Sequence, residues 1–168
     1  MNYRLVQPAV LIDLNPVASL AGIAKAKDGA IRIGAMTRHR TVERDTLLAR
    51  EQPLIGSAMG NVAHPQVRNR GTLGGNLAHA DPASEMPAAL LALDAQVLAR
   101  SSRGERWIRL EHFFNGVYST ALTETEMLAE IAVPALPANS RTCFIEVARR
   151  RGDFAMIGVA VVIKVCSK

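Results

Sequence analysis

Cysteines and aromatic residues are scarce in this sequence of 168 residues, and their scarcity excludes several classes of protein. The two cysteines, Cys143 and Cys166, have neither CxxC nor metal-ligand spacing, so we expect isolated thiols without a disulfide framework or metal site. Aromatic residues make up only 4% of the chain, which leaves few rings on which nucleic-acid bases could stack. No apolar run approaches the roughly 18 residues of a membrane span, and the first residues lack the order of a signal peptide. We therefore expect a cytoplasmic protein with no membrane span.

The chain is basic, with a net charge of +5, and its densest cluster of positive charge is the run of arginines at residues 149–151. A net positive charge of this size can bind a nucleic acid, an acidic partner subunit or the pyrophosphate of a cofactor. The shortage of stacking residues disfavours the first of these partners. We therefore expect no nucleic-acid partner.

The length and an apolar fraction of 49% indicate one globular domain, or one domain and a piece of another. Asp28 and Gly29 lie between two alternating runs, which is a strong hairpin signal, and a second hairpin is expected around residues 102–104. Short apolar runs predict strands at residues 9–14, 23–27, 30–35, 96–100, 105–110, 127–133, 142–148 and 154–165. Short strands joined by hairpins, without regular βαβ alternation, predict an α+β fold in which a mixed or antiparallel sheet is flanked by helices.

Helix signals occur at three places in the sequence. We expect a helix capped by Thr41, a helix over residues 53–62 with apolar positions at helical spacing, and a helix over residues 85–93 capped by Ser84. The intervening stretch, residues 64–82, is rich in glycine, asparagine, histidine and arginine and has little periodicity. We expect irregular structure there.

This stretch and the residues just after it carry the chemistry. Three glycines, Gly71, Gly74 and Gly75, allow a positive φ and a close approach of the backbone to a ligand, and successive N–H groups in such a turn can form a nest for an anion. Thr72 and Asn76 add polar side chains between and beside them, and carboxylates follow at residues 81 and 85, where they could reach sugar hydroxyls. These groups together would suit a nucleotide.

The glycine spacing in this stretch excludes two common nucleotide-binding turns. It does not follow the GxGxxG pattern of a Rossmann turn, and no Gly-Lys-Ser/Thr follows as in a P-loop. Paired glycines also occur in ordinary turns without any ligand. The residues alone therefore leave both interpretations open, a nucleotide site and a plain loop.

Two segments, residues 65–76 (PQVRNRGTLGGN) and 80–85 (ADPASE), resemble a flavin-binding loop of the molybdenum hydroxylase family, in its carbon monoxide and xanthine dehydrogenase medium subunits. The whole run matches, which makes the resemblance specific. Further similarities cover nearly the entire chain and occur at residues 2–5, 10–14, 33–37, 127–131 and 150–155. The resemblance implies that the chain has the fold of the second FAD-binding subdomain of that family.

The resemblance also implies FAD as the cofactor and assigns residues to it. Five residues would line its pyrophosphate and adjoining parts: Thr72, Leu73, Gly74, Gly75 and Asn76. Glu85 would be an acidic contact, Asp81 either a contact or a loop cap, and Leu128 either a contact or, as we favour, part of a strand core. Arg68 would neutralise a phosphate, stay solvated or pair with Asp81 or Glu85. No nucleophile–base pair or metal cluster stands out, so we expect no catalytic residue and no metal ligand.

The function that the resemblance implies is that of an oxidoreductase subunit. It would bind FAD and pass electrons from iron–sulfur clusters through FAD to an acceptor, beside a molybdenum-cofactor large subunit and an iron–sulfur small subunit. The alternative is a non-redox nucleotide-binding or interaction module of the same fold that no longer holds flavin. Residues 1–134 would be the FAD-binding subdomain without the family's first flavin loop, and residues 135–168 the beginning of the C-terminal domain. We expect such a chain, truncated at both ends, to bind FAD weakly or not at all by itself.

Overall fold

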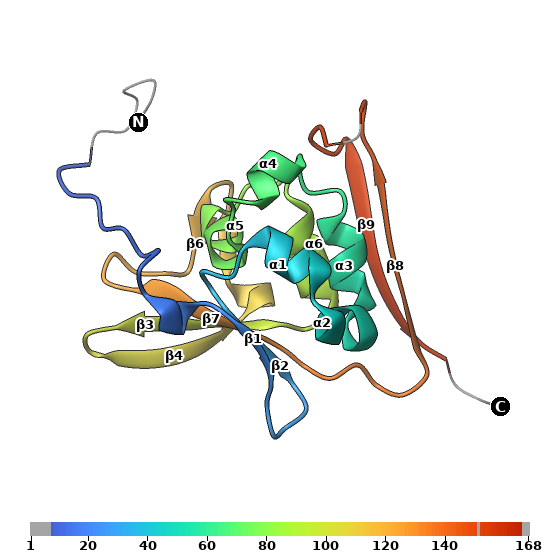
Figure 1. Ribbon diagram of the computed structural model, residues 1–168, viewed down its shortest axis with the longest axis horizontal. Helices are drawn as coiled ribbons and strands as arrows, with labels where there is room; N and C mark the ends of the chain where they lie inside the picture. The colour runs from blue at the N-terminus through green and yellow to red at the C-terminus, as the bar shows by residue number, and fades with distance from the viewer. Residues whose placement is uncertain (1–7, 151, 166–168) are drawn as a thin grey trace.

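The computed structural model describes residues 8–150 and 152–165, which form an α+β fold (Figure 1). The similarity at residues 2–5, the arginine at 151 and Cys166 lie outside the described residues. The α-helices are α1 (His39–Arg44), α2 (Thr46–Glu51), α3 (Pro53–Met59), α4 (Pro65–Arg68), α5 (Leu73–His79) and α6 (Glu85–Ala92). The strands are β1 (Ile23–Lys25), β2 (Ile31–Gly34), β3 (Gln96–Ser101), β4 (Gly104–Arg109), β5 (Phe114–Gly116), β6 (Ser119–Thr120), β7 (Met127–Val133), β8 (Ser140–Val147) and β9 (Ile157–Lys164).

The main sheet has five strands in the order β1-β2-β7-β3-β4, and every neighbouring pair is antiparallel. Both predicted hairpins are confirmed: β1 turns into β2 at Gly29, with a φ of +85°, and β3 turns into β4 at Gly104, with a φ of +144°. The Asp28 carboxylate supports the first turn by accepting a hydrogen bond of 3.0 Å from the Ala30 N–H. The predicted α+β class with an antiparallel sheet flanked by helices is therefore confirmed.

The helices gather over one face of this sheet, above it in Figure 1. The residues that point toward them alternate along the strands, as a sheet with one buried face requires. These residues have no exposed surface, and they are Ile31, Ile33, Val97, Ile131 and Val133. Register pairs such as Ile33 with Ile131 place apolar side chains from neighbouring strands side by side.

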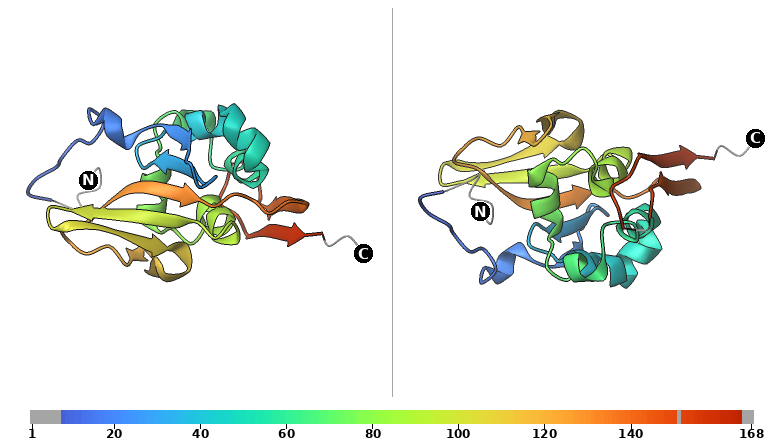
Figure 2. Two further views of the ribbon diagram at one scale, coloured as in Figure 1. Left: turned by 90° about the horizontal axis from the view of Figure 1, so that it is seen from below. Right: turned by 90° about the horizontal axis from the view of Figure 1, so that it is seen from above.

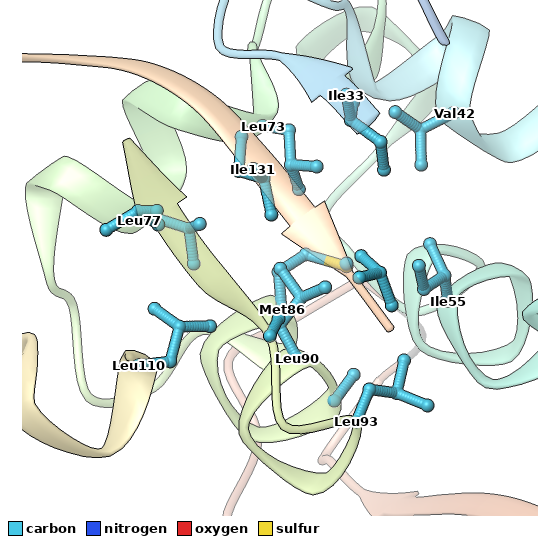
Figure 3. Close-up of a cluster of buried hydrophobic side chains, with 14 of the residues drawn as sticks. Ile33, Val42, Ile55, Leu73, Leu77, Met86, Leu90, Leu93, Leu110 and Ile131 are labelled. Atoms are coloured by element: carbon cyan, nitrogen blue, oxygen red, sulfur yellow. The ribbon is translucent and has the colours of Figure 1, made fainter. Parts of the chain in front are cut away.

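Helices α5 and α6 are held on the sheet by the core shown in Figure 3. Leu73 and Leu77 are four residues apart on α5, and Met86 and Leu90 are four apart on α6, so each pair faces the same side of its helix. All four side chains are fully buried. Burying each contributes roughly 1.5–3 kcal/mol. This packing fixes the beginnings of both helices, where the residues assigned to FAD are found.

Strands β8 and β9 form a separate two-stranded antiparallel sheet that packs against α3 and α6. Figure 2 shows this hairpin at one end of the molecule, away from the N-terminal segment. Its inward face carries Phe144 and Val162, whereas Ile145, Val159 and Ile163 on the other face are exposed. β9 begins at Ile157, three residues later than predicted, because the residues before it belong to the turn.

Three sequence-based expectations are wrong. Residues 9–14 form no strand: Val10, Leu11 and Ile12 are exposed, and β1 pairs only with β2 among the described residues. The helix assigned to a Thr41 cap begins earlier, at His39, because Arg38 forms a β-bridge with Thr72 and so occupies the extended position before the helix. Residues 64–82 are not irregular, because α4 and α5 lie within them.

No helix in the described part of the chain has both the length and the apolar character needed to cross a membrane.

Candidate functional site

A cavity of about 800 Å³ lies between the turn that joins β8 to β9 and the helices α4, α5 and α6. Its wall combines polar and charged side chains with apolar ones from the turn. The lining includes His39, Val67, Asn76, His79, Asp81, Glu85, Arg149 and Phe154. Three of the residues assigned to FAD from the sequence, Asn76, Asp81 and Glu85, are thus brought to one cavity although they belong to different elements.

The segment expected to be an anion-binding loop is the first turn of α5. Thr72 is the residue before the helix, and its Oγ1 accepts a hydrogen bond of 3.2 Å from the Gly75 N–H. The Leu73 N–H donates to the Thr37 carbonyl at 3.0 Å, and the Gly74 N–H donates to the Ala35 carbonyl at 2.8 Å. The expected nest of unpaired N–H groups is therefore wrong, because the fold itself uses the N–H groups of Leu73, Gly74 and Gly75.

The two neighbouring glycines are required for different reasons. A Cβ on Gly74 would lie 2.4 Å from the Cβ of Ala35 and 2.7 Å from its Cα, so only glycine lets α5 pack this closely on the end of β2. Gly75 is exposed, and a Cβ there would approach only the Thr72 hydroxyl, at 2.7 Å. Gly75, and not Gly74, is exposed at the surface, one residue before Asn76 in the cavity wall.

Leu73 and Leu128 lie in the hydrophobic core and not in the cavity wall. Leu73 has no exposed surface, and Leu128 is 7% exposed within β7. For Leu128 this is the strand-core position that we favoured from the sequence. Both side chains can influence a cofactor only through the packing of the elements that carry them.

The loop between α5 and α6 is held by hydrogen bonds of its own polar residues. The Asn76 amide and the Ser84 hydroxyl are joined at 2.8–2.9 Å. Asp81 Oδ1 accepts a hydrogen bond of 2.9 Å from the Ala83 N–H, which is the loop-cap role considered from the sequence. The predicted start of α6 at Glu85 is confirmed, but the Ser84 hydroxyl bonds to Asn76 and makes no cap hydrogen bond to the helix.

Glu85 is an acid held in a poorly solvated position. It is 8% exposed, and burial raises the pKa of its carboxyl, with the charges of Glu146 and Asp81 acting in the same direction. Burial also raises the pKa of Glu146 on β8. The two residues line a second, smaller cavity of about 150 Å³ between α6 and the β8–β9 hairpin. Such a carboxyl is suited to hydrogen bonding with a ligand hydroxyl.

Arg68 is a structural anchor, which the sequence did not indicate. It is 7% exposed; its Nε lies 3.2 Å from Glu43 Oε2, and its Nη1 donates to the carbonyls of Val62 at 2.8 Å and Ala63 at 3.0 Å. Burial raises the pKa of Glu43, but the hydrogen bonds and charges of Arg40 and Arg68 outweigh it and hold the pKa below its usual value. The expected alternatives for Arg68, solvation or pairing with Asp81 or Glu85, are wrong.

The histidines around the cavity differ in their surroundings. His79 lines it and stacks on Tyr118, with ring centroids 4.9 Å apart. His64 lies against the hairpin turn, because a Cβ on Gly152 would come within 2.5 Å of its ring. His39, which the sequence did not single out, is 3% exposed and lines the cavity. Among the described residues no group of histidine, cysteine and carboxylate side chains could hold a metal ion.

The chain is similar to proteins of known function over nearly all of its length. It is 43% identical, over 97% of the chain and 55% of the relative, to the 6-hydroxypseudooxynicotine dehydrogenase complex subunit alpha of Paenarthrobacter nicotinovorans. It is 42% identical, over 97% of the chain and 55% of the relative, to the caffeine dehydrogenase subunit beta of a Pseudomonas species. The chain thus spans just over half the length of these relatives.

A solved structure of carbon monoxide dehydrogenase from Hydrogenophaga pseudoflava matches with a TM-score of 0.95 and 37% identity. The match covers 99% of this chain and 58% of that chain, and it confirms the fold that the sequence resemblance implied. The family model described as the FAD binding domain in molybdopterin dehydrogenase matches residues 1–136. The chain therefore belongs to the family of FAD-binding domains of molybdopterin dehydrogenases.

Proposed function

We propose that the cavity beneath the β8–β9 turn holds part of FAD, and that Thr72, Gly75, Asn76, Asp81 and Glu85 bind it. The observation that carries this proposal is the convergence of two carboxyls and an amide on one cavity of about 800 Å³, with the start of α5 directly before the amide of Asn76. Cavities of about 300–1,000 Å³ with a few polar groups in an otherwise apolar wall are typical of cofactor sites.

The chemistry of the wall fits the parts of a flavin nucleotide. The Thr72 hydroxyl accepts the Gly75 N–H and can donate its own proton to a phosphate oxygen, and Arg149 adds positive charge on the wall formed by the turn. Asp81 and Glu85 offer oxygens to sugar hydroxyls. Leu73, Gly74 and Leu128 contribute indirectly, because they keep α5 and β7 in place. Of the eight residues assigned to FAD from the sequence, five would therefore contact the cofactor and three would support the site.

At the level of the whole protein, we propose the FAD-binding electron-transfer subunit of a molybdenum hydroxylase. The proposed partners are a molybdenum-cofactor large subunit and an iron–sulfur small subunit, and the proposed location is the cytoplasm. The similarity to a carbon monoxide dehydrogenase and to subunits of dehydrogenase complexes supports this proposal. Bound FAD would accept and donate the electrons. The residues of this chain bind it, orient it and exclude water from it.

We further propose that residues 1–134 are the FAD-binding subdomain and that residues 135–168 begin a second one. The end of the family match at residue 136 supports this division. The separation of β8 and β9 from the main sheet supports it as well.

The experiment that tests the function is titration of FAD into the cofactor-free protein at its natural full length, followed by calorimetry and by the flavin absorbance spectrum. We expect binding by the wild type and weaker binding by Asn76→Ala and Glu85→Ala. Glu124→Ala, which changes an exposed loop residue outside the cavity, is the matched control and should bind as the wild type does. A wild-type protein that takes up no FAD would favour the non-redox nucleotide-binding or interaction module.

A further inference from the structure

His39 is a buried polar side chain in the cavity wall, and the FAD site proposed above gives it no role. It is the first residue of α1 and is only 3% exposed, yet it lines the cavity. Within the described part of the chain, neither Nδ1 nor Nε2 of the ring has a hydrogen-bond partner of normal geometry. A neutral imidazole carries one donor and one acceptor, and nearly all such buried groups in proteins are paired.

The protein closes off one edge of the ring. A Cβ on Gly71 would lie 2.9 Å from Nδ1 and 3.1 Å from Cε1, so the Gly71 backbone packs directly against that edge. The His39 backbone is also tied there, because its N–H donates to the Gly71 carbonyl at 2.9 Å. His39 also lines the cavity, although Nε2 itself is buried in the protein alone, so a group bound there would meet Nε2 after a small shift of the ring.

The neighbouring charged group is not available as a partner. Arg68 is committed to Glu43 and to the carbonyls of Val62 and Ala63. Burial lowers the pKa of His39; an imperfect hydrogen bond with the Thr72 backbone opposes this shift, and the charge of Arg68 adds to it. Burial and the charge of Arg68 thus favour the neutral ring, which offers a hydrogen bond without a charge.

We propose that His39 is a further FAD-binding residue, whose Nε2 pairs with a hydroxyl group on one of the sugar chains of the cofactor. This inference rests on the proposed function. A hydroxyl both donates and accepts, so it matches either tautomer of a neutral imidazole. A phosphate oxygen only accepts, and would be better matched by a charged ring, which this position disfavours. Binding of FAD would then supply the hydrogen-bond partner that the buried imidazole lacks in the protein alone.

The test is His39→Phe in the full-length protein, with two readouts that should move in opposite directions. Phenylalanine is somewhat larger than histidine but keeps a flat ring and has no unpaired nitrogens, so the melting temperature of the cofactor-free protein should rise. The dissociation constant for FAD should increase about 3- to 10-fold, the cost of one hydrogen bond. His39→Gln, which keeps a donor and an acceptor, should restore part of the affinity. His112→Phe changes a 75% exposed histidine outside the cavity and should alter neither readout.

Titrations with ADP and FMN separate the two sugar chains, because ADP carries only the ribose and FMN only the ribityl chain. Weaker binding of ADP by His39→Phe would identify the ribose, and weaker binding of FMN the ribityl chain. A wild type that binds FAD while His39→Phe binds it within twofold would overturn the inference and leave the proposed function intact. A wild type that binds no FAD would overturn both.

If His39→Phe does not fold, a crystal structure of the wild type with FAD decides the question. A cofactor oxygen within about 2.7–3.2 Å of Nε2 supports the inference. A ring that contacts only protein contradicts it.

Discussion

Gly74 packs so closely on Ala35 that its own N–H donates to the Ala35 carbonyl at 2.8 Å, and a Cβ would lie 2.9 Å from that same oxygen. This contact joins the first turn of α5 to the end of β2. The glycine pair, which belongs to the run that resembles a flavin-binding loop, is therefore partly needed for packing. The position of the site depends on this contact, because α5 carries Asn76 and leads into the loop with Asp81, after which Glu85 begins α6.

Gly74→Ala should destabilise the protein, because the added methyl group meets the backbone of Ala35, which cannot move independently of the sheet. We expect a loss of about 1–3 kcal/mol in the free energy of unfolding, as for other overpacked sites. Gly75→Ala is the matched control: its methyl group faces only the Thr72 hydroxyl, so the loss should be clearly smaller. Urea denaturation measures both, and equal losses would contradict the packing role of Gly74.

Arg68→Met should be costly, because it leaves the Val62 and Ala63 carbonyls and the Glu43 carboxylate without their partner. Breaking a fully buried ion pair costs about 3–5 kcal/mol, and the partial exposure of Glu43 reduces this to about 2–3 kcal/mol. Arg70→Met removes an exposed arginine from the same turn and should change stability by less than about 0.5 kcal/mol. Thermal melts of the two variants would then differ widely; similar melts would show that Arg68 is not an anchor.

Thr72→Ala should shorten or fray the start of α5, since the Thr72 hydroxyl accepts the Gly75 N–H. Loss of such a cap costs about 1 kcal/mol. Thr72→Ser keeps the hydroxyl and should retain most of the stability. Amide hydrogen exchange at Gly75 is the direct measurement, with faster exchange expected for alanine only. Unchanged exchange in Thr72→Ala would mean that the cap does not hold the helix start.

Glu85→Gln should stabilise the cofactor-free protein at neutral pH. Burial raises the pKa of Glu85 in the folded state, so the folded protein binds this proton more tightly than the unfolded chain does. The stability that Glu85 contributes is therefore lost as the pH rises from about 4.5, its pKa in the unfolded chain, through its raised pKa in the folded protein. The variant should show a flatter dependence of the melting temperature on pH over that window. If the melting temperature of the wild type does not fall relative to that of Glu85→Gln over this pH window, the pKa of Glu85 is not raised.

Local patterns were sufficient for the parts of the fold that depend on neighbouring residues. The hairpins at Gly29 and Gly104, β7 and the start of α6 all follow from alternation, turn residues and helix spacing, which are properties of short segments. The predicted strand at residues 9–14 has the same apolar character but no neighbouring strand among the described residues. A strand needs hydrogen bonds from a partner, so its sequence alone cannot determine whether it forms.

The family resemblance located the region of the site, because residues 65–85 carry a specific run of residue types. The role of each residue was decided by contacts between segments distant in sequence. Gly74 is buried against Ala35, Arg68 is paired with Glu43, and His39 is brought to the cavity wall by the close approach of Gly71. The sequence by itself thus determined the two hairpins, the α+β class and the family. Only the tertiary structure decided which polar groups are already paired within the protein and which remain for a ligand, because burial and hydrogen bonding depend on the packing of the whole chain.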